Sequence, residues 1–198
     1  MTASAWGVAC LRVLVCALLV ALYSPLFAQR PGSLRDRSEF AKTLAPYVPS
    51  PQAVVDRMLD AAELKPGETL YDLGCGDGIV LITAARRFGA KAVGVELSKK
   101  LVDAAQERIR ALNLQERVKV IHGDLMNVNL EPADVVTVYL ETASNDLLRP
   151  KLEKYLKPGA RVVSHDFEIR GWKPVKVERI PAYHRDHMIY VYRMPPRK

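Results

Sequence analysis

Short apolar runs alternate with amphipathic stretches along the chain between residues 50 and 195. The runs predict strands over residues 69–73, 91–96, 118–122, 134–140 and 160–164. Apolar positions at helical spacing predict helices over residues 51–62, 78–88, 98–112 and 145–156, the last restarting at Pro150. Alternation over residues 175–180 and 188–194 predicts a terminal β-hairpin. Strands that alternate with helices indicate an α/β fold, a parallel sheet with helices on both faces.

Serines precede two of these helices. Ser50 and Ser98 each stand just before the first apolar position, so we expect both side chains to cap the free N–H groups of the first turn. Pro51 suits the first helical position, because its missing N–H would be unpaired there anyway. The domain is therefore predicted to span residues 50–198. A polar, proline-containing linker covers residues 30–49 and holds a short ordered piece near Phe40–Leu44.

Residues 1–29 form an apolar N-terminal segment. Val13 to Gln29 carries no charge, and its 17 residues are at the short end for a membrane span. More basic residues follow this run than precede it, so an anchor would place the main domain in the cytoplasm. A signal peptide cleaved after Ala28, with export of the domain, is the alternative, and a buried soluble helix is a third reading. We favour the anchor, in which this segment contacts the membrane.

The net charge of +7 would suit an acidic partner. The basic residues are scattered, however, and no run of five occurs, so they are interpreted as solvated surface. Aromatic and basic residues do not cluster as they do in nucleic-acid readers, and no nucleic-acid partner is predicted. Cys75 is the one cysteine of the main domain, which excludes an internal disulfide there.

A glycine loop, Tyr-Asp-Leu-Gly-Cys-Gly-Asp-Gly, follows the first predicted strand. Its glycines allow a close approach of backbone to ligand, and the next helix offers free N–H groups. The G-x-G-x-G spacing differs from the dinucleotide fingerprint. The acids of the loop would repel a pyrophosphate and suit a cationic amino group. S-adenosylmethionine has such an amine, a sulfonium and no phosphate, and is the predicted cofactor. The loop residues concerned are Asp72, Gly74, Gly76, Asp77 and Gly78.

Two further acids stand at the ends of the next two strands. Glu96 can accept both hydroxyls of a ribose, although dinucleotide enzymes use an acid at the same place. Asp124 can accept a hydrogen bond from an adenine amine. Because ligands of open parallel sheets bind at the carboxyl ends of the strands, these acids and the glycine loop are predicted to form one cofactor site, with Leu97 and Leu125 beside them.

The stretches Asp72–Gly78, Glu96 and Gly123–Leu125 resemble the cofactor motifs of class I S-adenosylmethionine-dependent methyltransferases. The resemblance covers about residues 45–195. It implies a Rossmann-like fold of three layers, with a seven-stranded sheet whose last strand is antiparallel. It also implies that Asp72 and Gly74 face the methionine end of the cofactor, Glu96 the ribose and Asp124 the adenine.

A narrower resemblance involves the stretches Tyr47–Ser50, Val54–Leu59, Val138–Leu140 and Pro158–Ser164, together with the glycine loop. These are similar to the mitochondrial lysine methyltransferases that modify the ATP synthase c subunit and the adenine nucleotide carrier. That family also has an apolar N-terminal segment. The resemblance implies that Tyr47 and Ser50 fold over the methionine end of the cofactor. The chain departs from the family pattern at Glu141–Asn145.

Tyr139 and Glu141, after the fourth strand, are the predicted catalytic residues. Tyr139 would line the acceptor channel and Glu141 would orient an incoming ammonium group. The sequence Tyr139–Thr142 lacks the Asn/Asp-Pro-Pro-Tyr/Phe motif of enzymes that methylate base amino groups, which disfavours a DNA substrate. His184 and His187 stand alone before a terminal strand, and no metal site is predicted.

Three functions fit these patterns. The first is methylation of lysine side chains in a protein, including a membrane protein. The second is methylation of a lipid or quinone-like small molecule, which a membrane segment suits equally well. The third is a nicotinamide oxidoreductase or a non-catalytic cofactor-binding protein, against which the loop spacing and Asp124 argue.

Overall fold

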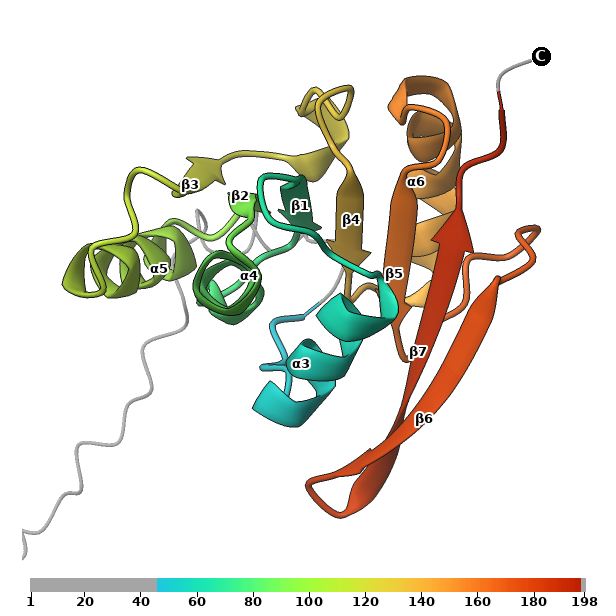
Figure 1. Cartoon of the computed structure of the whole chain (residues 1–198), viewed down its shortest axis with the longest axis horizontal. Coiled ribbons are helices and arrows are strands. Elements are labelled where there is room, and N and C mark those ends of the chain that lie inside the picture. Colours follow the sequence, from blue (N-terminus) through green and yellow to red (C-terminus); the bar gives the residue numbers. More distant parts are fainter. Residues whose placement is uncertain (1–45, 197–198) are drawn as a thin grey trace, which may run out of the picture. The chain divides into compact units, whose positions relative to one another are not determined.

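The computed structural model describes residues 46–196 (Figure 1). The apolar segment 1–29, the linker up to residue 45 and the piece predicted near Phe40–Leu44 lie outside this range. In the described part, no helix is both long and apolar enough to cross a membrane. The elements are α3 (Gln52–Ala61), β1 (Thr69–Leu73), α4 (Ile79–Phe88), β2 (Lys91–Glu96), α5 (Lys99–Ala111), β3 (Val118–His122), the 3-10 turn η1 (Leu125–Asn127), β4 (Val135–Val138), α6 (Thr142–Tyr155), β5 (Arg161–His165), β6 (Lys176–Ala182) and β7 (Arg185–Arg193).

The strands form one seven-stranded sheet in the order β3-β2-β1-β4-β5-β7-β6. Strands β1 to β5 are parallel, and β7 runs antiparallel to both β5 and β6. The predicted fold class, parallel order and terminal hairpin are thereby confirmed. Strand order reverses at β1, which lies between β2 and β4. The carboxyl ends of β1 and β4 therefore bound the crevice in which such sheets bind ligands.

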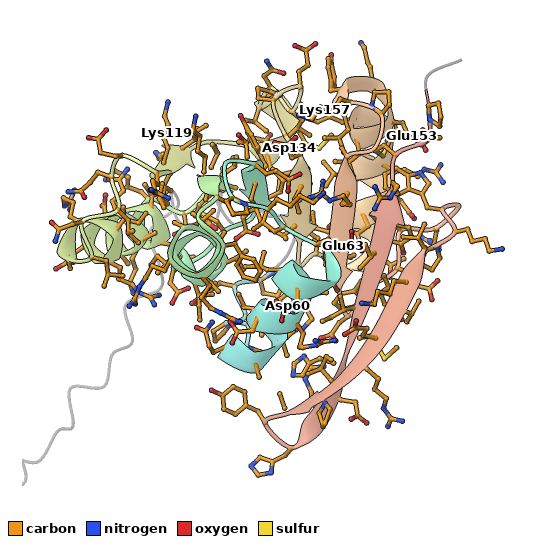
Figure 2. The ribbon with its side chains drawn as sticks, in the orientation of Figure 1. Asp60, Glu63, Lys119, Asp134, Glu153 and Lys157 are labelled. Carbon is orange, nitrogen blue, oxygen red and sulfur yellow. The ribbon has the colours of Figure 1, made fainter. Side chains whose placement is uncertain are left out.

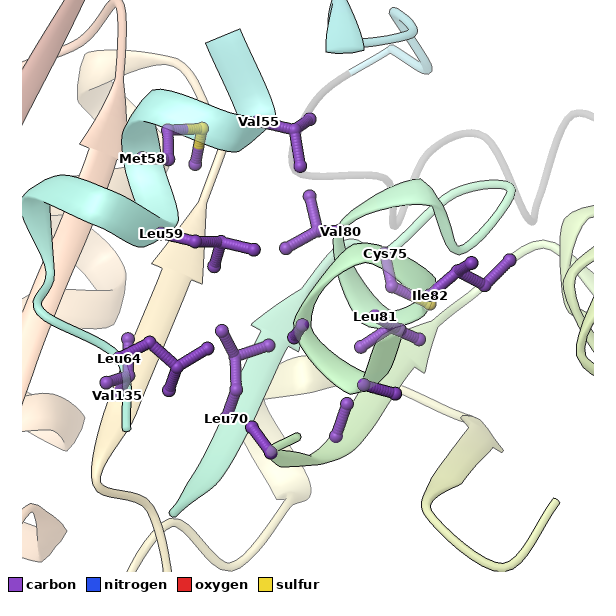
Figure 3. Close-up of a cluster of buried hydrophobic side chains, with 14 of the residues drawn as sticks. Val55, Met58, Leu59, Leu64, Leu70, Cys75, Val80, Leu81, Ile82 and Val135 are labelled. Atoms are coloured by element: carbon purple, nitrogen blue, oxygen red, sulfur yellow. The ribbon is translucent and has the colours of Figure 1, made fainter. Parts of the chain in front are cut away.

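Helices cover both faces of the sheet (Figure 1). On one face, α3, α4 and α5 pack their apolar sides on the strands, with Val55 and Leu59 near Val80 and Leu70 (Figure 3). On the other face, α6 packs on a second apolar cluster. Successive strand residues point to opposite faces. Every residue of β4 is buried, which accounts for its continuous apolar run in the sequence.

The amino end of the parallel strands is held by ion pairs. The buried guanidinium of Arg161 donates to the carbonyl of Ala62 at 2.9 Å and pairs with Glu68. Lys157 and Asp134 form a 2.6 Å pair at this end (Figure 2). Each buried charge here has a partner of opposite sign, so this end is suited to stability rather than chemistry.

Three local predictions were wrong. Neither Ser50 nor Ser98 makes a side-chain cap: Pro51 occupies the N-cap position of α3, and Ser98 stands at that of α5 without a capping bond. The helix predicted from Asn145 begins at Thr142 and continues through Pro150 without a restart. Proline is tolerated there because it breaks one hydrogen bond of a helix whose apolar side, including Leu148 and Leu152, is held in the core.

We expect Gly94→Ala to destabilise the fold. A Cβ at Gly94 in β2 would lie 2.5 Å from both the Sγ of Cys75 and a methyl carbon of Leu81. Such overpacking costs about 1–3 kcal/mol of unfolding free energy, measurable by urea denaturation. Gly123→Ala is the matched control, since its Cβ would meet only Ile121 at 3.9 Å. Equal stability of the two variants would contradict the close packing of β2 on α4.

Candidate active site

The glycine loop after β1 owes its shape to backbone angles that favour glycine. Gly74, Gly76 and Gly78 have φ values of +85°, +52° and +80°. The N–H of Gly74 donates to the carbonyl of Val95 at 2.9 Å, which holds the loop against β2. The N–H of Gly76 donates to Glu96 Oε2 at 3.0 Å, and that of Ser98 to Glu96 Oε1 at 2.8 Å. Glu96 thus joins the loop after β1 to the turn after β2.

Tyr47 lies over this loop. A Cβ at Gly76 would come within 2.5 Å of the Cε2 of Tyr47, so the ring rests directly on the glycine backbone. The ring is half exposed, and its burial and the nearby Asp77 raise the pKa of the phenol. The structure therefore brings Tyr47, Gly76 and Glu96 together, as expected of a shared site.

Asp72 is buried in β1 beneath the loop. Its Oδ1 accepts a 2.6 Å hydrogen bond from the hydroxyl of Thr137 in β4. Burial raises the pKa of Asp72 to about 7, the Thr137 hydrogen bond opposes this rise, and the negative charges of Glu96 and Asp77 add to it. None of these groups is cationic. A cationic ligand that approaches Asp72 would therefore stabilise its ionised form and lower its pKa.

Asp77 behaves differently from the prediction. It pairs with Arg108 of α5, whose guanidinium also donates to the Asp77 carbonyl at 3.0 Å. The Asp77 carboxylate is therefore neutralised within the protein and not free for a ligand amine. Cys75 is buried between the loop and β2, and burial raises the pKa of its thiol, which fits the packing role of a small residue rather than a nucleophile.

The residues predicted for the ribose and the adenine lie at the ends of β2 and β3. Glu96 is the register partner of His122, and Asp124 follows two residues later. Asp124 is exposed and accepts a 2.8 Å hydrogen bond from the N–H of Met126, which starts the turn η1. Leu125 is buried, and the carbonyl of Leu97 lies 3.0 Å from His122 Nε2.

Tyr139 and Ser50 meet through a histidine that the sequence did not single out. His165 ends β5 and is fully buried. Its ring stacks on Tyr139 with centroids 3.8 Å apart, and its Nδ1 lies 3.2 Å from Ser50 Oγ. Its Nε2 lies 2.8 Å from Nδ1 of His187 in β7. Burial lowers the pKa of His165 to about 4, so the ring is neutral at physiological pH.

Asp166 is a second residue that the sequence reading missed. It follows β5 directly, with φ +62°, and the hydroxyl of Tyr139 donates to its Oδ2 at 3.1 Å. Arg185 donates to the same oxygen at 2.7 Å. The signal was available: an acid at a strand end marked Glu96 and Asp124, and Asp166 satisfies the same rule.

Glu141 lies apart from this cluster. It stands at the N-cap position of α6, where its exposed side chain makes no capping bond. Asn145, one turn later, is buried and donates to Ser164 Oγ at 3.3 Å. Exposed Glu141 is therefore separate from the buried cluster around Tyr139.

His184 and His187, which stand close together in the sequence, lie in different environments. His184 is exposed, whereas His187 is buried against His165 and Asp166. The ligand atoms of His165, Asp166 and His187 lie within 4.8 Å of one another, close enough to hold a metal ion. Arg185 already supplies a positive charge at the carboxylate of Asp166, which disfavours a dication there.

These features coincide with a known family. Residues 72–176 match the ANTKMT methyltransferase domain. The chain belongs to this family. A protein-lysine N-methyltransferase of Saccharolobus islandicus is 46% identical over 148 residues, 74% of this chain and 92% of that protein. The human lysine N-methyltransferase named for the ATP synthase c subunit is 30% identical over 171 residues, 86% and 70% of the two chains.

Solved structures give the same fold. The crystal structure of an RNA methyltransferase from Salinibacter ruber, bound to S-adenosyl-L-homocysteine, has a TM-score of 0.71 and 39% identity. It covers 76% of this chain and 96% of that one. The predicted class I methyltransferase fold is confirmed, and S-adenosylmethionine is the cofactor of this methyltransferase. The glycine loop and the buried Asp72, which pairs with Thr137 and with no cation among the described residues, fit its cationic amino acid end.

We expect the affinity of this methyltransferase for S-adenosylmethionine to fall as the pH is lowered. We expect the charged form of Asp72 to attract the cofactor amine, and its pKa of about 7 leaves only about a tenth of it ionised at pH 6. The dissociation constant should therefore rise about tenfold from pH 8 to pH 6, as measured by calorimetry.

Two variants test the assignment to Asp72. Asp72→Asn keeps an acceptor for Thr137 but should bind weakly at every pH. Thr137→Val removes the hydrogen bond that lowers the Asp72 pKa, so the loss of affinity should begin at higher pH. An identical pH profile in the wild type and Asp72→Asn would assign the titration to another group.

Proposed function

We propose that this methyltransferase transfers the methyl group of S-adenosylmethionine to lysine side chains of a protein. The 46% identity to a protein-lysine N-methyltransferase, across 92% of that protein, carries the proposal. The element order supports it: strands and helices follow each other without an inserted lobe among residues 46–196. The acceptor end is then open to a large partner.

The proposed cofactor position follows the carboxyl ends of the strands. Asp72 and Gly74 face the methionine end, with Tyr47 and Ser50 over it. Glu96 binds the ribose through oxygens that also hold the backbone of Gly76 and Ser98. The residues assigned to the remaining part of the cofactor are Gly76, Gly78, Leu97, Asp124 and Leu125.

The reaction depends on placing a neutral lysine amine in line with the methyl–sulfonium bond. A lysine ammonium, with an ordinary pKa near 10.4, must lose its proton first. Burial at the mouth of the site disfavours the charged form and promotes this loss. Tyr139 lines the channel, and Glu141 orients the lysine as it enters.

The substrate and location are part of the proposal. The human relative is named for the ATP synthase c subunit, and a membrane protein is a fitting substrate for a chain whose residues 1–29 act as an anchor. The catalytic domain then lies in the cytoplasm, where the cofactor is made. Export after signal-peptide cleavage is the competing location.

RNA is the second candidate substrate. It is favoured by the 39% identity to a protein described as an RNA methyltransferase. Methylation of a lipid or quinone-like molecule remains the small-molecule alternative.

The deciding experiment is a label-transfer assay. The full chain and radiolabelled S-adenosylmethionine are incubated with membranes, and separately with total RNA, from cells that lack the gene. We expect label in one or a few protein bands and on lysine by mass spectrometry. Label only in the RNA or only in the organic extract would overturn the lysine proposal in favour of that substrate.

Glu141→Gln should lower kcat/KM for the labelled protein about fivefold without changing cofactor affinity. The reason is the loss of one exposed ion pair, the proposed pair between Glu141 and the ammonium group of the substrate lysine. Glu107→Gln, an exposed acid on α5, is the control. Activity of Glu141→Gln within about twofold of the wild type would remove Glu141 from the mechanism.

A further inference from the structure

The carboxylate of Asp166 is held rigidly at the acceptor end of the site. The N–H of Asp166 donates to the carbonyl of Met188 at 2.7 Å, and the N–H of Met188 donates to Asp166 Oδ1 at 2.9 Å. Oδ2 accepts from Tyr139 and Arg185 and also lies 3.3 Å from Nδ1 of His187. Only 12% of the side chain is exposed. One carboxylate oxygen is therefore fixed in place, and the other is offered to donors from the solvent side.

Charge on Asp166 persists despite its burial. Burial raises the pKa of this carboxyl, but hydrogen bonds from Met188 and Arg185 outweigh it, so the pKa is lowered overall. Neutral His165 lies 3.4 Å from Oδ2 and contributes no formal charge there at physiological pH. Asp166 is thus an anion in a partly desolvated place, where a cation is bound more strongly than at the surface.

Aromatic rings lie close to this anion, and one of them, Tyr139, donates its hydroxyl to it. The ring of Tyr139 packs on His165 at 3.8 Å, and Phe167 lies 6.3 Å from Tyr139 between centroids. Aromatic faces attract ammonium groups, and an acid beside such faces is the combination that suits an alkylammonium. The acidic residue and the rings come from the ends of β4 and β5, which are adjacent strands.

A side-chain cation already occupies this place. Arg185 begins β7 at the hairpin tip, and its side chain is half exposed. It donates to Oδ2 of Asp166 at 2.7 Å and to the Tyr139 hydroxyl at 2.9 Å. The residues before it, Tyr183 and His184, are exposed and have positive φ. A cationic group on a long side chain, as in Arg185, can therefore reach the carboxylate of Asp166 from the solvent without entering the core.

We propose that Asp166 and Tyr139 form the subsite that binds the ammonium group of the acceptor lysine, and that Arg185 fills this subsite until the acceptor displaces it. The proposal rests on the lysine function proposed above. A carboxylate stabilises the protonated amine, so Asp166 serves capture and orientation of the lysine rather than its deprotonation. Its effect should appear in KM more than in kcat.

Two variants should move KM in opposite directions. Asp166→Asn keeps the acceptor for Met188 and tolerates φ +62°, since Asn adopts this conformation readily. Loss of the charged contact should raise KM for the labelled protein about tenfold or more. Arg185→Gln removes the competing cation and should lower KM about twofold to fivefold.

Arg179→Gln is the matched control. Arg179 lies on β6 of the same hairpin and pairs with Asp186 rather than Asp166. Its KM should stay within about twofold of the wild type. Thermal melting of all three variants separates a loss of folding from a loss of capture. A rise of KM in Arg185→Gln would overturn the displacement model, since it would mean that Arg185 helps to bind the acceptor.

A binding measurement tests the subsite without turnover. The full chain contains four histidines, so ring ¹³C labelling gives four signals, assigned with His122→Gln and His184→Gln. n-Butylammonium, the lysine side-chain analogue, should shift the signals of His165 and His187 saturably, with n-butanol as the uncharged control. Affinity should fall at least tenfold in Asp166→Asn and rise in Arg185→Gln.

The outcomes separate the two proposals. Two results together would overturn the subsite and leave the lysine function intact. Asp166→Asn would still label lysine with an unchanged KM, and n-butylammonium would shift no histidine signal. Absence of lysine labelling in every protein, soluble or membrane-bound, overturns the proposed function and, with it, an acceptor role for Asp166, even where n-butylammonium binds.

Discussion

The carboxylate of Glu96 holds the ligand-binding end of the sheet together. Its two oxygens accept the N–H groups of Gly76 and Ser98, which belong to the turns after two different strands. Within the loop the N–H of Gly78 donates to the carbonyl of Cys75 at 2.9 Å, whereas the N–H of Gly76 takes its acceptor from Glu96. The residue inferred to bind ribose therefore also sets the shape of the loop that approaches the cofactor. The loop geometry and the proposed recognition of the ribose thus depend on one side chain.

Charge is treated differently at the two ends of the parallel strands. At the amino end, Arg161 meets Glu68 and Lys157 meets Asp134, so each charge is compensated. At the carboxyl end, the hydroxyl of Thr137 is the only close partner of the buried Asp72 among residues 46–196. An acid that lacks a counter-charge gains most from a cationic ligand. The uncompensated charge of Asp72, rather than the number of charged residues, distinguishes the ligand-binding carboxyl end of the strands from the amino end.

The acceptor end depends on contacts between segments far apart in the chain. His165 joins Ser50, 115 residues away, to Tyr139 and to His187. Its pKa of about 4 keeps the His165 ring neutral at physiological pH. The ring therefore fixes the positions of its neighbours without adding a charge to the site. The predicted helix cap at Ser50 failed because its hydroxyl bonds to this ring. The same competition for partners placed Asp77 with Arg108 instead of with a ligand.

The sequence by itself determined the alternation of strands and helices, the glycine loop and the acids at the strand ends, because these depend on local periodicity and backbone preference. The residues proposed to bind the cofactor, Asp72, Glu96 and Asp124, were selected this way. Only the tertiary structure decided which group each polar side chain meets, including Arg185 at Asp166. Periodicity states which face of an element is buried. It does not state which distant residue will lie opposite, since that depends on how all elements pack together.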